Sequence, residues 1–359
     1  MRTNTRTAVY SAAAVFLSFL FYIMPDTVTD AVSRALSVCA LRVIPAVFPF
    51  TVISSFFIKS GGADRIDALL SRPFHAIFGL SCGASALFCG LFFGFPLGAM
   101  CVGSLHSSGK IDKSEAARLL TFCACASPTY PVFAVGKGMF GSVGTGIMIW
   151  CVTSAVSVAI GFSLNILRPI GRPYKQSVAA CTRTLRLPEA VTASVADASR
   201  IMLNVCGSVT FFSLIGRVTS EMISAITESP YAALFVSSVF EFASGCAHSA
   251  EAYSSGLVNR SDALAISTFA IGFSGLSVIC QNASVLPHTG IALLPHIVSK
   301  FITGLLSCAV VYFLSSRIDS GINASVDFDT ASFSPVALIP SAVIVLIFVL
   351  TLIKNQKSA

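Results

Sequence analysis

Residues 107–122 of this chain read SSGKIDKSEAARLLTF, and residues 254–269 read SSGLVNRSDALAISTF, starting 147 positions later. In both segments the SSG is followed, in order, by a hydrophobic residue, a polar residue, a basic residue, Ser and an acid. Chance is a poor explanation for an ordered match of this kind. Self-similarity at a fixed offset is the signature of a repeated structural unit, so the sequence predicts two related halves.

The match extends outward from these two segments. Upstream, Thr51 and Ser54 match Thr210 and Ser213 after a change in loop length. The offset of 147 residues also aligns four further pairs, namely Phe93 with Phe240, Phe95 with Phe242, Gly98 with Gly245, and Ser127 with Ser274. The repeat therefore reaches well beyond the short polar segment, and we place the two copies at residues 43–166 and 200–315.

The composition places both copies in a membrane. Of the 359 residues, 55% are hydrophobic and only 11% are charged, and the mean hydropathy is +0.83. Soluble domains carry about 25% charged residues, so most of the surface of this chain is expected to face lipid. The net charge of +7 comes from Lys and Arg in loops beside apolar segments, where such residues set membrane topology. These numbers argue against intrinsic disorder and against nucleic-acid binding.

Apolar segments give the expected membrane crossings. Residues 76–105 are too long for one straight crossing of a hydrocarbon core about 30 Å thick, and they contain Gly94-Phe95-Pro96. We therefore expect a broken or kinked span there. Residues 31–42 and 114–126 are expected to form amphipathic segments. The expected spans cover residues 8–24, 43–58, 76–105, 139–166, 200–220, 231–252, 289–315 and 335–353.

The loop at residues 167–187 is the strongest topology marker, because it carries five basic residues and no acid. The excess of Lys and Arg on the cytoplasmic side predicts that this loop and both termini are cytoplasmic. Each copy holds three expected crossings. Because three is odd, the second copy must enter the membrane from the opposite side.

The predicted fold class is thus an all-α integral membrane protein. It has about eight transmembrane helices in two inverted-topology repeats, with broken helices or re-entrant hairpins. The predicted units are an N-terminal helix with an amphipathic approach (1–42), the first repeat (43–166), a basic cytoplasmic linker (167–199), the second repeat (200–315), and an outside loop with a last helix (316–359).

Helix breaks fall at equivalent places in the two copies. The segment 94–96 corresponds to 241–243, and 127–131 corresponds to 274–278. Irregular backbone at membrane depth is tolerated where it is buried in protein or lines a wet cavity, and many secondary carriers bind solute at such breaks. Kinks in tightly packed helices are the alternative. The residues singled out at the breaks are Gly94, Pro96, Ser127, Pro128, Ser274, Gly275 and Ser277, with Ser127 and Ser274 expected to cap helix N-termini.

Ionisable residues inside spans add to this candidate substrate site. Glu241 lies where the first copy has Gly94, and Lys300 falls near the middle of a span. An uncompensated charge at that depth is costly, so Lys300 is expected to pair with Glu241 or with an anionic solute. A purely structural buried pair is the alternative. The amides of Gln281 and Asn282 complete the set.

Other ionisable or nucleophilic residues suggest no chemistry. His296 is expected to pack at a membrane interface. Twelve cysteines occur mostly in apolar stretches, without a CxxC motif, and are read as packing residues. No HExxH, Walker or GxSxG motif appears in a suitable context. We therefore expect no catalytic residues, no metal site, no cofactor and no enzyme activity.

Two stretches carry a resemblance to a known family. Residues 92–122, FFGFPLGAMCVGSLHSSGKIDKSEAARLLTF, are followed by Ala-Ser-Pro, and residues 273–286, FSGLSVICQNASVL, are preceded by FEFASG at 240–245. These stretches resemble the YlbJ (SpoVV) family of sporulation integral membrane proteins. That family is placed in the wider nucleoside-recognition or Gate superfamily, which includes concentrative nucleoside transporters and the membrane part of ferrous-iron transporters.

The resemblance implies a carrier that moves dipicolinate across the outer forespore membrane during sporulation. The expected partner is a small anionic solute such as a dicarboxylate, within the lipid bilayer of a cell membrane crossed several times. Self-association is left open. Two alternatives also stay open: a non-transporting membrane component of spore or envelope assembly, and a carrier for nucleosides or ions.

Overall fold

The computed structural model describes residues 2–170, 186–227, 229–286 and 289–321. Within these ranges the regular structure is entirely helical, which confirms the predicted all-α class. Four helical segments are long and apolar enough to cross a membrane, at Val143–Leu167, Leu187–Ser224, Arg260–Ser284 and Leu294–Ser315. The expected last span at 335–353 lies outside the described residues, as does most of the basic loop.

The N-terminal part supplies a long helical arm. Helix α1 (Arg2–Ile23) meets α2 (Pro25–Val38) at a bend of 99°. A π-helical turn, η1 (Cys39–Val43), joins α2 to α3 (Ile44–Lys59) without a break in helical backbone. Helix α10 (Leu187–Ser224) packs along both α2 and α3. Each copy therefore begins with one long helix, and the two long helices lie side by side.

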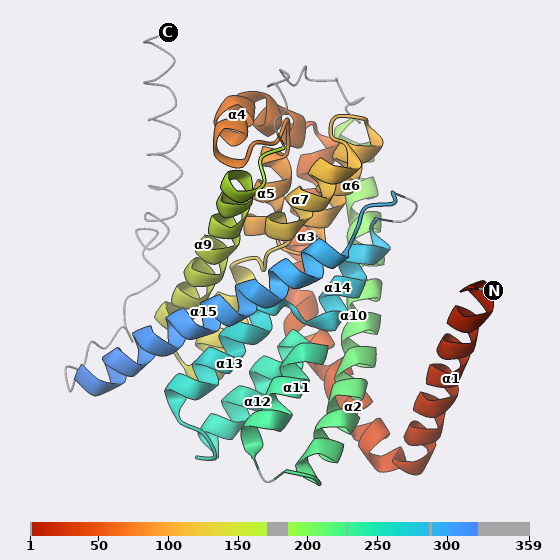
Figure 1. The fold of residues 1–359 in the computed structure, drawn as a ribbon, viewed down its shortest axis with the longest axis vertical. Helices are drawn as coiled ribbons and strands as arrows, with labels where there is room; N and C mark the ends of the chain where they lie inside the picture. The colour runs from red at the N-terminus through yellow and green to blue at the C-terminus, as the bar shows by residue number, and fades with distance from the viewer. Residues whose placement is uncertain (1, 171–185, 228, 287–288, 322–359) are drawn as a thin grey trace.

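Corresponding helices of the two copies occupy opposite ends of the molecule. Figure 1 shows α5, α6 and α7 in its upper part and α11, α12 and α13 in its lower part, while α10 runs through both. The first copy continues with α4 (Gly62–Phe78), α5 (Ala84–Phe92), α6 (Leu97–Ser107), α7 (Lys113–Cys123), η2 (Tyr130–Lys137), α8 (Gly138–Phe140) and α9 (Val143–Leu167). The second continues with α11 (Pro230–Phe240), α12 (Phe242–Ser254), α13 (Arg260–Phe273), α14 (Gly275–Ser284) and α15 (Leu294–Gly321).

The polar segments that revealed the repeat form the same turn twice. Gly109 and Gly256 both adopt positive φ angles, of 71° and 76°. Asp112 then caps α7 by accepting from the Glu115 N–H at 2.8 Å. At the equivalent place Asn259 caps α13 by accepting from the Asp262 N–H, also at 2.8 Å. We call the end of the molecule with the first turn the upper face and the end with the second the lower face (Figure 1).

The expected crossing at 76–105 is wrong, because this segment folds back on itself. A Cβ built on Gly98 of α6 would lie only 3.0 Å from the Cα of Gly90 in α5, so the two helices touch near the Gly94 turn. Farther from that turn, Cys89 and Cys101 are also in contact. Contacts between residues that lie progressively farther from the turn, one in α5 and one in α6, define an antiparallel hairpin. This apolar segment therefore forms two short helices, of 9 and 11 residues, instead of one long span.

The expected crossing at 231–252 is wrong for the same reason. A Cβ on Gly245 of α12 would lie 2.6 Å from the Cα of Ser238 in α11. Farther from the Glu241 turn, the Ser237 hydroxyl and the His248 Nδ1 are 2.9 Å apart. Hydropathy alone cannot separate a re-entrant hairpin from a crossing, because both hide apolar side chains from water.

The crossings missing from these two segments are made by the helices that follow each hairpin. Helices α13 and α14 together form an apolar stretch of 25 residues, interrupted at Ser274. Their first-copy counterpart is α7 with η2, so the expected amphipathic segment at 114–126 belongs to a broken crossing. If α3 and the α7–η2 pair also cross the membrane, each copy has three crossings plus one hairpin, and the inverted arrangement stays a prediction.

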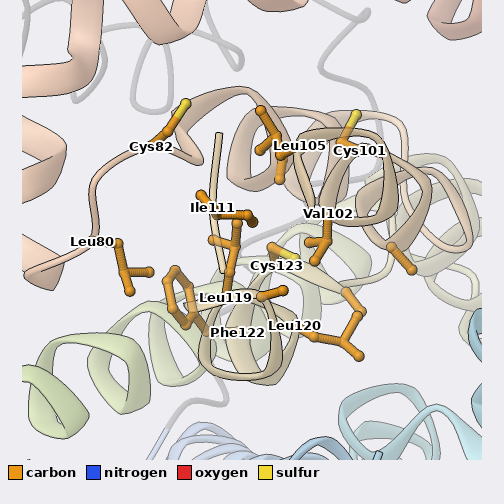
Figure 2. Packing of buried hydrophobic residues seen from close by; sticks show 14 of the residues in the cluster. Leu80, Cys82, Cys101, Val102, Leu105, Ile111, Leu119, Leu120, Phe122 and Cys123 are labelled. Atoms are coloured by element: carbon orange, nitrogen blue, oxygen red, sulfur yellow. The ribbon is translucent and has the colours of Figure 1, made fainter. Parts of the chain in front are cut away.

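The first hairpin is held by a dense core around α7. Figure 2 shows Leu119, Leu120, Phe122 and Cys123 packed among side chains of α6 and of the segment before α5. The glycines of the hairpin make room for backbone, because a Cβ on Gly90 would lie 1.5 Å from the Cys123 carbonyl oxygen. The end of α7 therefore wedges directly into the hairpin.

Buried carboxylates fix the start of α5. Asp67 of α4 accepts hydrogen bonds from the Ser85 N–H at 2.9 Å and the Ser85 hydroxyl at 2.6 Å. Glu115 of α7 accepts from the Ser81 N–H at 3.0 Å and its hydroxyl at 2.6 Å. Burial raises the pKa of Asp67, while the bonds from Ser85 oppose that rise. These contacts anchor the hairpin at the upper face.

Candidate functional site

The two breaks of each copy meet each other. In the first copy, a Cβ on Gly94 would lie 2.8 Å from the Ser127 nitrogen, so the hairpin turn touches the break after α7. In the second copy, a Cβ on Gly275 would lie 3.2 Å from the Glu241 Cα. The hairpins enter from opposite faces, so both pairs of breaks lie in the interior. In each copy, the hairpin turn thus contacts the later break.

A cavity lies where the breaks of the two copies come together. Its volume is about 40 Å³, and it is partly open to the outside. The breaks contribute Phe95, Ala126, Ser127, Tyr130 and Phe242, α14 contributes Gln281, and the long helices contribute Val43, Val47, Val205 and Val209. Both copies therefore build this one cavity, and two predicted site residues, Ser127 and Gln281, line it.

Aromatic rings dominate the wall of the cavity. The rings of Phe95 and Phe242, equivalent residues of the two copies, meet edge to face with centroids 5.3 Å apart. Tyr130 meets Phe242 in the same way at 4.9 Å. Such rings present flat apolar faces and edges to a bound molecule. Sequence reasoning aligned the two Phe residues but assigned them no role, and their position at the two hairpin turns was the usable signal.

Few polar groups interrupt this apolar wall. The Ser127 and Thr129 hydroxyls are 2.8 Å apart and bond each other. The Gln281 side chain is 4% exposed, and its amide nitrogen has no hydrogen-bond partner among the described residues. An unpartnered buried donor is costly, so this amide is placed to bond a molecule in the cavity.

Glu241 is fully buried, but it does not bind Lys300. Its carboxylate accepts from the Ala243 N–H at 3.0 Å and from the Ser244 N–H at 2.6 Å, which caps α12. Within the part of the chain that the structure describes, no ion pair joins Glu241 to Lys300. The expected pairing of Lys300 with Glu241 is therefore wrong, while its pairing with an anionic solute stays a prediction. The helix end that was expected to attract a carboxylate already holds one from the protein.

The first copy has no counterpart of this cap. Gly94 replaces Glu241 and brings no side chain. Pro96 takes the place of Ala243 and has no N–H to donate. The next N–H, of Leu97, bonds the Gly94 carbonyl at 3.1 Å. The turn of the first hairpin thus satisfies itself with backbone alone, and the two copies differ chemically at their turns.

The expected serine caps are not formed. The Ser127 hydroxyl bonds Thr129, and the Ser274 hydroxyl donates to the Ile271 carbonyl at 3.2 Å. Ser274 adopts a left-handed φ of 71°, so its backbone turns away from the extended geometry that a capping serine uses. Pro128 lies in the same break as Ser127, and its carbonyl accepts from the Val132 N–H at 3.0 Å.

Ser277 and Asn282 lie on α14 but do not line the cavity. Both are buried, and the Ser277 hydroxyl has no partner among the described residues. Asn282 contacts His296, with its amide nitrogen 3.2 Å from the imidazole Nε2. The Nδ1 of that ring lies 3.0 Å from the Leu120 carbonyl oxygen. His296 is fully buried within the protein, and its expected position at a membrane interface stays a prediction.

Lys300 lies on α15 beside the end of α7, and it does not line the cavity. It is 2% exposed and makes no hydrogen bond or ion pair with the described residues. Its neighbours on α15 hold the end of α7, because Ser299 donates to the Thr121 carbonyl at 3.0 Å. The Lys300 charge is thus buried without a protein counter-ion in this part of the chain.

Across the described ranges, no group of three or more His, Cys, Asp or Glu side chains is arranged to hold a metal ion.

Comparison with known proteins supports the family resemblance. The chain is 25% identical over 355 aligned positions to the sporulation integral membrane protein YlbJ of Bacillus subtilis (strain 168). The alignment covers 87% of this chain and 83% of that relative. No family model matches the chain, so its place in the wider Gate superfamily stays a prediction. No solved structure matches it either. The chain is a multi-pass membrane protein, and its resemblance to the YlbJ family of sporulation integral membrane proteins is confirmed over most of its length.

Proposed function

We propose that this protein is a membrane carrier for a small, flat, anionic solute, and that dipicolinate is that solute during sporulation. The observation that supports the proposal most is the cavity built by the breaks of both copies. Paired broken helices around a central site are the arrangement by which many secondary carriers bind solute and expose it to alternate sides. The sporulation role is suggested by the name of the relative.

The chemistry of the cavity favours a flat ring. Phe95, Phe242 and Tyr130 offer aromatic surface, and the Gln281 amide and Ser127 hydroxyl offer a few polar contacts. A pyridine ring with two carboxylates has a planar face for the rings and acceptors for the amide nitrogen. Lys300 supplies a buried positive charge beside the end of α7, which would lower the cost of bringing in an anion.

Reconstitution tests this function directly. The purified full chain in liposomes should take up radiolabelled dipicolinate in a saturable manner, and excess unlabelled dipicolinate should compete. Protein-free liposomes and a non-aromatic dicarboxylate such as succinate serve as controls. Equal uptake of both acids would contradict recognition by the aromatic wall.

The same assay separates the alternatives. Uptake of a nucleoside such as uridine without uptake of dipicolinate would favour a nucleoside carrier. A folded protein that moves neither solute would contradict the carrier proposal and favour a non-transporting component of spore or envelope assembly.

A further inference from the structure

A stripe of side chains on α10 leads from the cavity to the lower face. Val209, Ser213, Arg217 and Glu221 follow one another at intervals of four residues, so they lie on one face of the helix. Val209 lines the cavity. Each interval advances about 6 Å along the helix axis. The stripe therefore begins apolar at the cavity and turns polar toward the end of α10.

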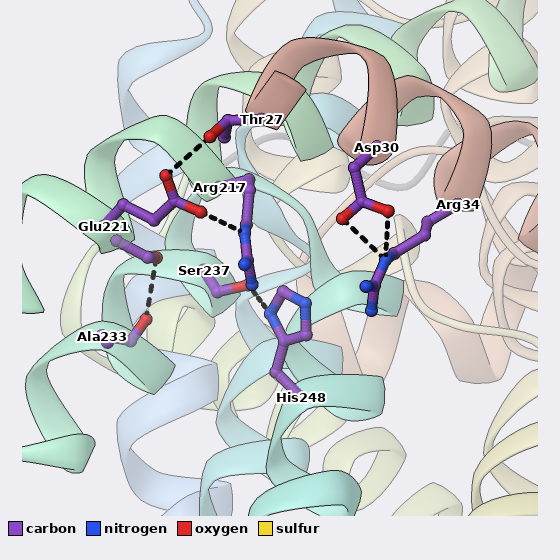
Figure 3. A network of polar contacts seen from close by, with 9 residues as sticks. Thr27, Asp30, Arg34, Arg217, Glu221, Ala233, Ser237 and His248 are labelled. Atoms are coloured by element: carbon purple, nitrogen blue, oxygen red, sulfur yellow. Dashed lines mark hydrogen bonds and ion pairs between the residues drawn. The ribbon is translucent and has the colours of Figure 1, made fainter. Parts of the chain in front are cut away.

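Helix α12 faces this stripe with polar residues of its own. The Ser244 hydroxyl lies 2.7 Å from the Ser213 hydroxyl. One turn farther, His248 bonds Ser237 at 2.9 Å, and Figure 3 shows the Arg217 side chain reaching toward both of them. We call the contact between Ser213–Glu221 of α10 and Ser244–Glu251 of α12 the α10–α12 seam.

The lower end of the seam is closed by charged pairs. Arg217 donates from its Nε to Glu221 at 2.8 Å, and Glu221 also accepts from the Thr27 hydroxyl at 3.0 Å (Figure 3). Beside them on α2, Arg34 and Asp30 form a second pair at 2.9 Å. These groups link the arm of α2 to α10 next to the second hairpin.

The seam is more open than its surroundings. Helix α10 packs closely along α11, but its backbone seldom approaches that of α12. Exposure rises along the seam: Ser213 is buried at 8%, Ser244 and His248 are half-buried, and the Arg217 side chain is 41% exposed. Polar side chains, with little close backbone packing between them, separate the cavity from water at this face.

The equivalent contact in the first copy is less polar. Ser54 is equivalent to Ser213, but its hydroxyl donates to the Thr51 carbonyl of its own helix at 2.9 Å. Ile58 stands where α10 has Arg217, Leu97 where α12 has Ser244, and Cys101 where α12 has His248. Leu97 and Cys101 are buried at 1% and 4%. The nearby ring of Phe57 packs against two others, with centroids 5.8 Å from Phe88 and 6.0 Å from Phe93. The upper contact is thus mainly apolar and tightly packed, while the lower contact is mainly polar.

We propose that the α10–α12 seam is the passage by which the solute moves between the central cavity and the lower face. Ser213, Ser244 and His248 line this passage, and the pairs around Arg217 close its outer end. The inference rests on the proposed carrier function. A solute with carboxylates needs hydrogen-bonding groups along its route, because apolar walls would strip its hydrating water and offer no hydrogen bonds in exchange. The second-copy contact supplies Ser213, Ser244 and His248, whereas its first-copy equivalent supplies Ser54, Leu97 and Cys101.

Thiol accessibility tests the passage without any transport measurement. Two variants are compared. The first keeps Cys101 as its single cysteine, and the second has all native cysteines replaced and carries His248→Cys. Each is placed in lipid nanodiscs, where a hydrophilic thiol reagent can reach both faces. We expect Cys at 248 to react at least about tenfold faster than Cys101, because reaction requires thiolate in contact with water. Equal rates would overturn the proposal. Ser244→Cys, one turn deeper, gives the same comparison against Leu97→Cys if the first variant does not fold.

A cross-link tests whether the solute uses the seam. In the cysteine-free background, Ser213→Cys with Ser244→Cys places two thiols where the hydroxyls bond each other at 2.7 Å. Oxidation should form a disulfide, abolish dipicolinate uptake, and be reversed by reductant. Complete cross-linking with undiminished uptake would overturn the passage. Absence of uptake in the wild-type chain would instead contradict the carrier function, and the accessibility contrast would still decide whether the seam opens to water.

Discussion

At the scale of single residues, Glu241 acts first as a helix cap. Two backbone N–H groups hold its carboxylate, at 3.0 and 2.6 Å, at the turn of the second hairpin. Replacing a capping residue by Ala costs about 0.5–2 kcal/mol. Glu241→Ala should therefore lower the thermal unfolding temperature, and Glu241→Gln, which keeps one acceptor, should lower it less. The measurement is a melting curve of the purified chain.

The first copy supplies the control for Glu241. Gly94 is equivalent in position and contributes no cap, so a hairpin turn without a carboxylate is compatible with this fold. If Glu241→Ala had the same unfolding temperature as the wild type, the cap would contribute nothing measurable to stability. The carboxylate would then be free for another purpose, such as a transported proton. In that case Glu241→Gln should remove the pH dependence of uptake.

Lys300 differs from Glu241 because no described protein group compensates its charge. A hydrogen bond to a charged group contributes about 1.5–3 kcal/mol, so loss of an attraction of this kind weakens binding about tenfold or more. Lys300→Met should weaken uptake of dipicolinate by this order and leave expression intact. The measurement is the concentration dependence of uptake in liposomes.

Thr153, the first-copy equivalent of Lys300, is the matched control. Its hydroxyl bonds only carbonyls of its own helix, at 2.9 Å to Ile149 and 3.1 Å to Trp150. Thr153→Val should therefore leave uptake unchanged. Unchanged uptake in Lys300→Met as well would remove Lys300 from the site.

At this scale, the sequence indicated which residues are unusual but not which of them touch. Glu241 and Lys300 were recognisable as charges at membrane depth. Their supposed contact failed because a glutamate at a helix start can be satisfied by the next two N–H groups, which is a local choice. The aromatic wall was missed because Phe is common throughout this chain, with 29 copies. Only the repeat alignment distinguished Phe95 and Phe242 from the others.

At the scale of elements, the first hairpin depends on glycines that admit the end of α7. A Cβ on Gly90 would lie 1.5 Å from the Cys123 carbonyl oxygen, which is backbone and cannot move aside cheaply. Gly90→Ala should therefore force the hairpin and α7 apart and sharply reduce the yield of folded protein. Size-exclusion profiles of the detergent-solubilised chain would show this as aggregation.

Gly207 of α10 provides the comparison for Gly90. It is exposed and helical, and nothing lies within 4 Å of a Cβ built on it. Ala is favoured over Gly in a helix by about 1 kcal/mol. Gly207→Ala should leave the profile unchanged or improve it. A monodisperse Gly90→Ala chain would mean that the hairpin and α7 are not wedged together.

The second hairpin gives a milder test at the same scale. Gly275 has a φ of 70° and touches the turn at Glu241, where an added Cβ would lie 3.0 Å from the Phe242 nitrogen. Gly275→Ala combines backbone strain with pressure on a wall residue of the cavity. Uptake should fall strongly while the chain still inserts into the membrane. Wild-type uptake would show that the meeting of these breaks is a packing feature.

Sequence patterns located the breaks but not the direction of the chain after them. The residues 76–105 are uniformly apolar whether they cross or turn back, and Gly94-Phe95-Pro96 suits a kink as well as a reversal. The polar first turn of α7, from Lys113 to Glu115, made 114–126 resemble a surface segment. Only the contacts across each turn, such as Gly90 with Gly98, separate a hairpin from a crossing.

At the scale of the whole molecule, the proposed carrier function rests on two copies that are similar but not identical. Inverted copies give two faces with equivalent hairpins, and a carrier with such symmetry can open to either side. The differences then assign roles to the two sides. Glu241 against Gly94, Lys300 against Thr153, and the polar seam against its less polar counterpart all place the added polar groups in the second copy.

The inverted arrangement predicts that Ser108 and Ser255 lie on opposite sides of the membrane. These serines are equivalent, exposed, and followed by glycines with nearly equal φ angles, of 71° and 76°. Cysteines at the two positions should therefore have similar intrinsic reactivity.

In a cysteine-free background, a membrane-impermeant thiol reagent added to intact cells should label Ser255→Cys and leave Ser108→Cys unlabelled until the cells are opened. The reason is that Ser108 lies at the same face as the ends of the basic 167–187 loop, which the positive-inside rule places in the cytoplasm (Figure 1). Labelling of Ser108→Cys alone from outside would reverse the orientation but keep the inversion. Labelling of both positions from the same side would exclude an inverted repeat, and with it the symmetric carrier.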